Sequence, residues 1–237
     1  FTIGDGGLGY KQKSDKHAHF DIMHCIDQIE YSKHKESILN SLGFNTKGYI
    51  YVDPRTNKSY YRFYTEQHPD FSAAYKHIYN RGRKGIDKHL LRDLDDRSLA
   101  YIFMDDGSSH RTNKQNIRGT YKIYSDYITS DYRISINSFP LDEINMFRYW
   151  LEDRFAIESN LEPQFKSHRI IIKKKESMAN LKSIVDKYIV NCMGYKTEKP
   201  HSFFGIPYTV ISGSQTEREN SSNIEDDATV ESEPSGA

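Results

Sequence analysis

Two aspartates, each followed by a glycine, occupy corresponding places in two similar segments of the chain. The first segment reads Phe1-Thr-Ile-Gly-Asp5-Gly-Gly, and the fuller second one reads Leu99-Ala-Tyr-Ile-Phe-Met-Asp-Asp106-Gly. An apolar stretch that ends in glycine indicates the C-terminal end of a helix. A carboxylate at that negative end is unfavourable unless a cation or a close partner compensates its charge.

A single Asp-Gly pair is usually an ordinary helix end or turn, but its repetition favours a shared site. Two symmetry-related helix ends would place two carboxylates side by side, where they could hold one or two divalent cations. Such a site suits phosphodiester hydrolysis, because the metals stabilise both the attacking and the leaving oxygen. We therefore predict that Asp5 and Asp106 are catalytic residues and metal ligands. The adjacent Asp105 would contribute a carbonyl or face solvent, since the first copy has Gly4 there.

The elements that follow each acid are expected in the same order. For the first copy we predict strands at 8–13 and 18–25, a helix at 28–42, a hairpin of strands 48–52 and 59–65, and a short helix at 71–79. In the helix at 28–42 the inward residues would be Ile29, Ile38 and Leu42, and Gly43 would end it.

For the second copy, Asp95 or Asp96 would cap the acid-bearing helix and Gly107 would end it. Strands are predicted at 121–124 and 132–137, and Ser138 would cap the next helix, whose inward face would hold Leu141, Ile144, Phe147, Leu151 and Phe155. A hairpin is expected at 162–166 and 169–173, with its turn at 167–168, before a last helix marked by Met178, Leu181, Val185 and Tyr188. The pattern predicts an α+β fold of two pseudo-twofold-related αββαββα halves with antiparallel sheets.

The predicted strands carry polar residues that suit nucleic acid. Strand alternation puts Lys58, Tyr60, Arg62 and Tyr64 on one face and Ser59, Tyr61 and Phe63 on the other. A two-stranded ribbon fits the major groove, where basic and amide side chains contact base edges. One such strand alone is more simply a solvated sheet face, but four ribbons in a repeated chain favour DNA. The remaining DNA-binding candidates are Lys11, Lys13, Arg133, Ser135, Asn137, Lys166, Arg169 and Lys173.

The charge distribution agrees with a nucleic-acid partner, although the net charge is zero. Residues 211–237 hold seven acids and one base, which leaves 32 bases against 26 acids, a net charge of +6, in residues 1–210. We expect the acidic tail to be disordered, because it lacks apolar residues to bury. No run of about 18 apolar residues occurs, so no membrane partner is expected. The two cysteines, Cys25 and Cys192, should be reduced thiols of an intracellular protein, in the mitochondrial matrix or in a bacterial or phage-infected cytoplasm.

The two acid-bearing segments resemble the signature helices of the LAGLIDADG homing endonucleases. The resemblance continues through Ile136-Asn-Ser-Phe139 and Asn191-Cys-Met-Gly-Tyr-Lys196, covers about residues 1–205, and is strongest for the single-chain, two-repeat subgroup encoded in group I introns. It implies a saddle of two halves, 1–89 and 90–210, whose four-stranded sheets grip double-stranded DNA. It also implies a monomer that uses Mg²⁺ to cut both strands across the minor groove and leave 3′ overhangs.

The family places a basic residue of each half near the active centre, and Lys84 and Lys196 match those positions. The resemblance implies that each lysine positions or activates water, or stabilises charge that develops on the phosphate. The alternatives are a phosphate clamp or a plain surface charge, and Arg83 would replace Lys84 if the register slips by one residue.

Two other functions fit the same resemblance. The first is an intron RNA maturase that assists group I splicing, with the intron RNA as partner, and the second is a DNA-binding regulator that does not cut. Retention of both Asp5 and Asp106 disfavours the regulator, whereas nothing in the sequence separates nuclease from maturase. Only four residues precede Asp5, so we expect either that the first signature helix begins before this chain or that the contact between the halves is weakened.

Overall fold

Two antiparallel sheets of four strands each form the frame of the molecule. The computed structural model describes residues 2–12, 15–80, 82–113 and 127–197. The first sheet has the order β1-β2-β4-β3 and the second the order β7-β8-β10-β9, so both halves repeat one topology. The strands are β1 (Gly7–Gly9), β2 (His19–Cys25), β3 (Thr46–Val52), β4 (Ser59–Thr65), β7 (Gly107–Asn113), β8 (Tyr127–Ile134), β9 (Asn160–Gln164) and β10 (Ser167–Ile172). The predicted α+β fold with two αββαββα halves and a saddle of antiparallel sheets is confirmed.

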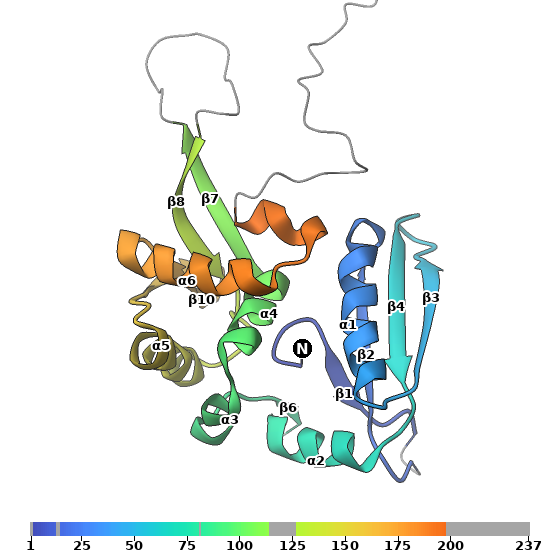
Figure 1. Ribbon diagram of the computed structural model, residues 1–237. Coiled ribbons are helices and arrows are strands. Elements are labelled where there is room, and N and C mark those ends of the chain that lie inside the picture. The colour runs from blue at the N-terminus through green and yellow to red at the C-terminus, as the bar shows by residue number, and fades with distance from the viewer. Residues whose placement is uncertain (1, 13–14, 81, 114–126, 198–237) are drawn as a thin grey trace, which may run out of the picture.

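Helices lie against one face of each sheet and between the two halves (Figure 1). The first half contributes η1 (Ile26–Gln28), α1 (Ile29–Ser41) and α2 (Pro69–Ile78), and the second contributes α4 (Asp96–Asp106), α5 (Leu141–Phe155), α6 (Lys175–Tyr188) and η3 (Asn191–Lys196). A small hairpin of β5 (Tyr79–Asn80) and β6 (Arg83–Lys84) and the short helix α3 (Lys88–Asp93) join the halves; the sequence pattern did not predict them. None of the described helices is long and apolar enough to cross a bilayer.

The central helix α4 begins and ends close to the predicted residues. The side chain of Asp95 accepts a hydrogen bond from the backbone N–H of Ser98 at 2.8 Å, which is an N-cap. Gly107 follows the last turn with φ −84°, so it does not end the helix through a left-handed conformation. A Cβ at Gly107 would instead clash with the ring and carbonyl of Phe103. Glycine is therefore needed because β7 leaves the helix directly over its last turn.

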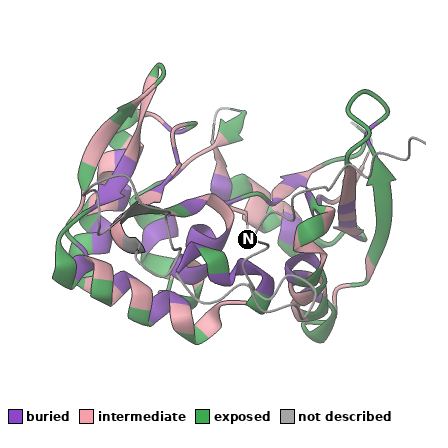
Figure 2. Cartoon of the chain, turned by 90° about the horizontal axis from the view of Figure 1, so that it is seen from above, coloured by how far each residue is buried: buried purple, intermediate pink, exposed green. Residues whose placement is uncertain are grey.

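The core lies under both sheets and extends between them. Phe20, Ile22 and Phe63 fill the helix-covered face of the first sheet, and Ile134 and Ile170 fill that of the second, all at most 2% exposed. The predicted placement of Tyr61 and Phe63 on the face of the strand opposite Tyr60 and Arg62 is confirmed, and their burial shows that this face points inward. Seen from above, the buried residues gather in the middle, whereas the outer edge of the first sheet is exposed (Figure 2).

Several predicted strand boundaries are wrong. β1 ends at Gly9, short of the predicted strand at 8–13, and β8 ends at Ile134, short of Asn137. β7 was not predicted, because its polar sequence Gly-Ser-Ser-His-Arg-Thr-Asn has no apolar alternation. The last hairpin turns at 165–166, two residues before the predicted turn. The predicted strand at 121–124 and the acidic tail at 211–237 lie outside the described residues, as does Lys13.

The inward faces of two helices also differ from the prediction. In α1 the buried residues are Tyr31, Ser32, Lys35 and Leu39, whereas Leu42 is 66% exposed. Ile29 and Ile38 are partly buried and pack against the core as predicted, so only the placement of Leu42 is wrong. The pattern did not predict that α1 also buries Tyr31 and Lys35, which are paired with Asp105 of the other half. In α5 the N-cap is Pro140 rather than Ser138, and Leu141 is exposed, while Ile144, Phe147 and Leu151 are buried as predicted. Gly43, at φ +88°, follows the end of α1 as predicted.

Candidate active site and nucleic-acid interface

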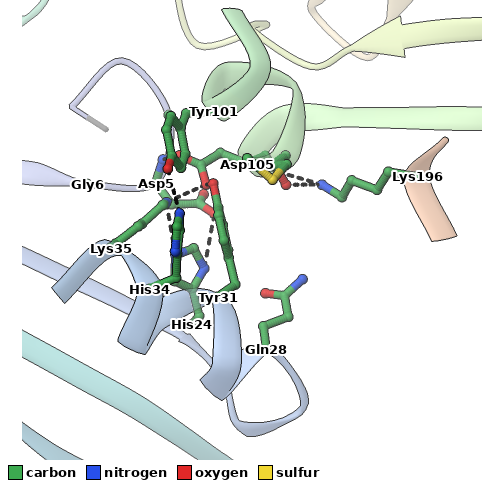
Figure 3. A network of polar contacts seen from close by, with 12 residues as sticks. Asp5, Gly6, His24, Gln28, Tyr31, His34, Lys35, Tyr101, Asp105 and Lys196 are labelled. Carbon is green, nitrogen blue, oxygen red and sulfur yellow. Dashed lines mark hydrogen bonds and ion pairs between the residues drawn. The ribbon is translucent and has the colours of Figure 1, made fainter. Parts of the chain in front are cut away.

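The two aspartates singled out by the sequence meet at the centre of the molecule. Asp106 is the last residue of α4, and Asp5 ends the turn that precedes β1, beside the last turn of α4. The backbone N–H of Asp5 donates to Oδ2 of Asp105 at 3.3 Å (Figure 3). A Cβ at Gly4 would clash with the Asp105 carboxylate, so glycine permits this close approach. The repeated segments are therefore direct neighbours, as the prediction required.

The Asp106 carboxylate is only partly compensated by the nearby charges of Lys84 and Lys196. Burial, and next the charges of Asp5 and Asp105, raise the pKa of Asp106 to about 7. Within the described part of the chain, this side chain makes no hydrogen bond or ion pair. Asp5 is more open, with 43% of its side chain exposed, and its pKa is also raised, first by burial and then by Asp105. Carboxylates that repel one another in a partly dry site are suited to bind a cation.

Lys84 and Lys196 both lie at this centre, each at the end of one acid-bearing segment. Lys84 Nζ donates to the carbonyls of Gly4 at 2.9 Å and Gly6 at 2.5 Å. Lys196 Nζ donates to the carbonyls of Met104 at 2.5 Å and Asp105 at 2.9 Å. Each lysine thus donates to two backbone carbonyls of the acid-bearing segment of its own half, and both contact the carbonyl of the residue before the acid. Neither is a plain surface charge, since Lys196 is 7% exposed and Lys84 is half-buried.

Each lysine keeps donor capacity for a substrate. An ammonium group has three N–H donors, and two of them are used on carbonyl oxygens. Burial lowers the pKa of Lys196 to about 8 and lowers that of Lys84, while the nearby aspartates oppose both shifts. Arg83, the predicted alternative to Lys84, points elsewhere: its guanidinium binds Glu143 at 2.6 Å.

Asp105 neither faces solvent nor acts through its carbonyl alone, which corrects the expectation for this residue. Its side chain is 0% exposed and accepts from Lys35 Nζ at 2.5 Å and from the hydroxyl of Tyr31 at 2.8 Å. Its backbone carbonyl accepts from Lys196, as described above. Both side-chain partners come from α1 of the other half. Burial, followed by the charge and hydrogen bond of Asp105, raises the pKa of Tyr31 well above its ordinary value, so the phenol is the donor.

His24 completes this group and forms, with Asp5 and Asp105, a set of possible metal ligands that the Lys35 ammonium disfavours. Its Nε2 lies 3.2 Å from Lys35 Nζ and its Nδ1 lies 3.4 Å from Oδ2 of Asp5. Burial and then Lys35 lower the pKa of His24 to about 4, so the ring is neutral near pH 7. Ligand atoms of Asp5, His24 and Asp105 fall within 4.8 Å of one another. The Lys35 ammonium already contacts Asp105 and His24, however, which leaves the oxygen-rich side of Asp5 and Asp106 as the better place for a cation.

Sequence reasoning missed His24, Tyr31 and Lys35. Tyr31 and Lys35 are four residues apart and so share a helix face, but nothing in the sequence marks that face as buried. His24 follows the alternation of β2, in which Phe20 and Ile22 also point inward. The only signal in the sequence that could have identified His24 is the strand alternation of β2, which places this histidine on the inward face.

The open face of the first sheet is rich in aromatic residues. Tyr60, Arg62 and Tyr64 of β4 are half-buried there, and the neighbouring strands place Tyr51 opposite Tyr60 and Tyr49 opposite Arg62. The rings of Tyr51 and Tyr60 lie 6.4 Å apart, and those of Tyr49 and Tyr64 lie 6.5 Å apart. Arg62 is paired with Asp21 of β2. Beside the sheet, Lys11 Nζ lies 4.1 Å from the centre of the Tyr64 ring, and Lys58 is exposed at the start of β4.

The open face of the second sheet carries a ladder of ion pairs instead. Arg133 Nε contacts Asp131 at 2.8 Å and Glu162 at 3.5 Å, and Arg169 contacts Glu162 at 2.5 Å. His110 lies 3.3 Å from Asp131 at the other end. The remaining predicted DNA contacts lie at the ends of strands: Ser135 and Asn137 follow β8, and the exposed Lys166 and Lys173 flank β10. The two open faces therefore differ in chemistry although they share a topology.

Comparison with known proteins places this arrangement in one family. Among solved structures, the homing endonuclease I-WcaI bound to its DNA recognition sequence has a TM-score of 0.62 and 20% identity, over 82% of this chain and 81% of that chain. The structure of I-DmoI in complex with DNA and Ca has a TM-score of 0.45 and 11% identity, over 77% and 83%. The N-terminal LAGLIDADG domain of DUF199/WhiA has a TM-score of 0.43 and 17% identity, over 77% and 75%. Curated protein sequences give no significant match. The model of the LAGLIDADG DNA endonuclease family matches residues 2–181, and the chain belongs to that family.

Proposed function

We propose that this chain is a site-specific DNA endonuclease that makes a staggered double-strand break by metal-dependent phosphodiester hydrolysis. It would act as a monomer, because both halves of the saddle and both acids lie in one chain. The observation that carries the proposal is the meeting of Asp5 and Asp106, from repeated segments, between two open sheet faces. The resemblance to the intron-encoded subgroup supports intron homing as the setting of this activity.

The residues at the centre fit a divalent cation. The available donors are carboxylate oxygens of Asp5 and Asp106, the ligand type that Mg²⁺ prefers. Asp106 has a raised pKa and makes no hydrogen bond or ion pair in the described structure, so a bound cation would favour its charged form. When bound, Mg²⁺ would polarise the scissile phosphate and stabilise the charge on the attacking and leaving oxygens. Asp5 and Asp106 would hold the metal from opposite halves.

The two lysines would act beside the acids. Lys84 and Lys196 fix the carbonyl ends of the acid-bearing segments and so hold each carboxylate in place. Their remaining N–H donors would contact a phosphate oxygen or orient water. A buried ammonium near a developing negative charge stabilises it more than one in water, because the surroundings are less polarisable. We propose this role for both lysines, one in each half.

The open sheet faces would hold the DNA on either side of this centre. We propose that the aromatic face of the first sheet reads base edges mainly by apolar contact, for example with thymine methyl groups. The second sheet would read them with Arg133 and Arg169, which Asp131 and Glu162 hold in place. The exposed lysines at the strand ends would contact phosphates, which position the duplex without reading its sequence.

Cleavage of a randomised duplex library by the purified full chain tests this function. We expect a small set of related sequences to be cut when Mg²⁺ is present, with 3′ overhangs at the sequenced ends, and no cutting in EDTA. A DNA-binding regulator would enrich sequences without cutting them. A maturase would instead accelerate splicing of its intron RNA and cut no member of the library, and either outcome would overturn the proposal.

A further inference from the structure

A buried ion pair joins the two halves directly behind the acids. Lys35 of α1 and Asp105 of α4 are 2.5 Å apart, and both side chains are 0% exposed. Removing two charges from water is costly, and apolar residues of similar size often serve a fold equally well. Stability alone therefore does not explain why this ion pair is buried, and the residues that it contacts indicate its functional role.

The same pair is linked to Asp5 in two ways, directly through Asp105 and indirectly from Lys35 through His24. Asp105 Oδ2 accepts from the backbone N–H of Asp5 at 3.3 Å. Lys35 Nζ lies 3.2 Å from Nε2 of His24, whose Nδ1 lies 3.4 Å from the Asp5 carboxylate. A lysine ammonium only donates, so Nε2 must accept and the ring proton must sit on Nδ1, facing Asp5. Figure 3 shows these side chains converging on one point.

The second half has no equivalent of this group among its described residues. Gly107 pairs with Ile134, and Gly6, which likewise follows its acid, would by the register of β1 face Ile22. Ile22 and Ile134 are therefore equivalent positions of the two halves. Two residues further along the chain, His24 is equivalent to Ile136. Lys35 and Phe147 are also equivalent, because Lys35 follows His24 by the same number of residues as Phe147 follows Ile136.

The equivalent positions are therefore apolar where the first half is polar. Ile136 is 1% exposed and Phe147 is 0% exposed, so both belong to the core. The counterpart of Asp105 is Gly4, which has no side chain to offer. Within the described residues, Asp106 thus lacks the two contacts that Asp5 has, one to a buried carboxylate through its backbone N–H and one to a buried histidine through its side chain. The molecule is asymmetric at the point where its pseudo-twofold axis would make the two acids equal.

We infer that Lys35, Asp105 and His24 form a positioning unit whose side chains hold Asp5 and make no contact with the Asp106 carboxylate, so that this unit affects cleavage of one DNA strand more than cleavage of the other. The inference rests on the proposed nuclease function. A duplex that shares the pseudo-twofold axis brings each strand nearer to one acid, so a displaced Asp5 slows one cut more than the other. None of the three residues has to touch DNA or metal.

The test is a neutral pair of substitutions, Lys35→Met with Asp105→Asn. This double variant removes both charges at once, so neither is left buried alone, and it should fold. On a duplex recovered from the library and labelled on each strand in turn, we expect cleavage of one strand to fall at least about tenfold relative to the other, so that nicked DNA accumulates. The matched control is Lys182→Met with Asp186→Asn, which neutralises a surface pair of the same residue types, 2.6 Å apart in α6.

A second measurement needs no DNA. The ¹⁵N shifts of the His24 ring should show a protonated Nδ1 and an unprotonated Nε2 in the wild type, and this preference should be lost in the double variant but not in the control. Equal slowing of both strands, or unchanged rates with unchanged ring shifts, would overturn the inference. If the wild type cuts neither strand with Mg²⁺, the proposed function fails, and the ring shifts still test the hold on Asp5.

Discussion

Replacing Asp106 with asparagine should stabilise the metal-free protein while it removes cleavage. The pKa of Asp106 is raised from 3.8 to about 7, first by burial and next by the neighbouring carboxylates. The folded state therefore holds the charged form at a cost that the unfolded chain does not have. Asparagine keeps the shape of the side chain without the charge, so folding no longer carries that cost.

The expected gain in unfolding free energy follows from the size of the pKa shift of Asp106. A rise from 3.8 to about 7 corresponds to roughly 4 kcal/mol, at about 1.4 kcal/mol for each unit of pKa. The Asp106 carboxylate is only partly buried, so screening by solvent and salt reduces the expected gain in unfolding free energy to ~1–2 kcal/mol. For a chain of this size that is an increase in Tm of about 3–6 °C.

The sign of the effect depends on pH. A carboxylate whose folded pKa is raised binds its proton more tightly in the folded state, so the stability this gives is present at low pH and lost as pH rises through about 7. The asparagine side chain of the variant does not titrate, so its advantage over the wild type should be small at pH 5 and largest at pH 8. Saturating Mg²⁺ should also reduce the difference, since the metal compensates the charge in the wild type.

Thermal unfolding in EDTA at pH 5, 6.5 and 8 measures the difference in stability between Asp106→Asn and the wild type. Asp105→Asn is the matched control, because it makes the same change one residue earlier and leaves Lys35 buried without its anion; its Tm should fall, in keeping with a loss of ~3 kcal/mol. If Asp106→Asn is no more stable than the wild type at pH 8, or if its advantage is equal at pH 5, the reasoning about its charge is refuted.

Further substitutions test other parts of the structure. Lys58→Ala should reduce the salt slope of DNA binding by about one unit if the side chain contacts phosphate, whereas Arg62→Ala should relax base preference at one position of the target; unchanged affinity and preference in both would place β4 outside the groove. Gly4→Ala should lower Tm because its Cβ meets the Asp105 carboxylate, and an unchanged Tm would show that this contact relaxes freely. Lys196→Met should reduce the cleavage rate at least ~100-fold with DNA affinity nearly unchanged, and retained cleavage would rule out its proposed role.

The element order and the meeting of the acids were predictable because their signals are local. The alternation in β4 fixes which residues point inward, and glycine after each acid marks where the acid-bearing segment ends and a strand begins. Repetition then indicates symmetry, which brings Asp5 and Asp106 together without any knowledge of side-chain contacts. Lys84 and Lys196 were expected near the acids because of the family resemblance, and no local pattern in the sequence indicates their positions.

The network behind Asp5 was not predictable, because it is made by residues far apart in sequence. Lys35 and Asp105 are 70 residues apart, and each alone reads as a charged residue on a polar helix face. Their burial appears only when the halves are packed together. In the same way β7 is polar throughout and is recognisable as a strand only through its pairing with β8.

The most direct test of the central claim is strand-resolved cleavage by Asp106→Asn on a duplex that the wild type cuts. The carboxylate would hold metal but touch no base edge, so we expect sequence-specific binding within about threefold of the wild type. Double-strand cleavage with Mg²⁺ should fall by at least about 1000-fold, which corresponds to roughly 4 kcal/mol of lost transition-state stabilisation. Cleavage at the wild-type rate by this variant would contradict the account of Asp5 and Asp106 as the two metal-binding acids of a nuclease.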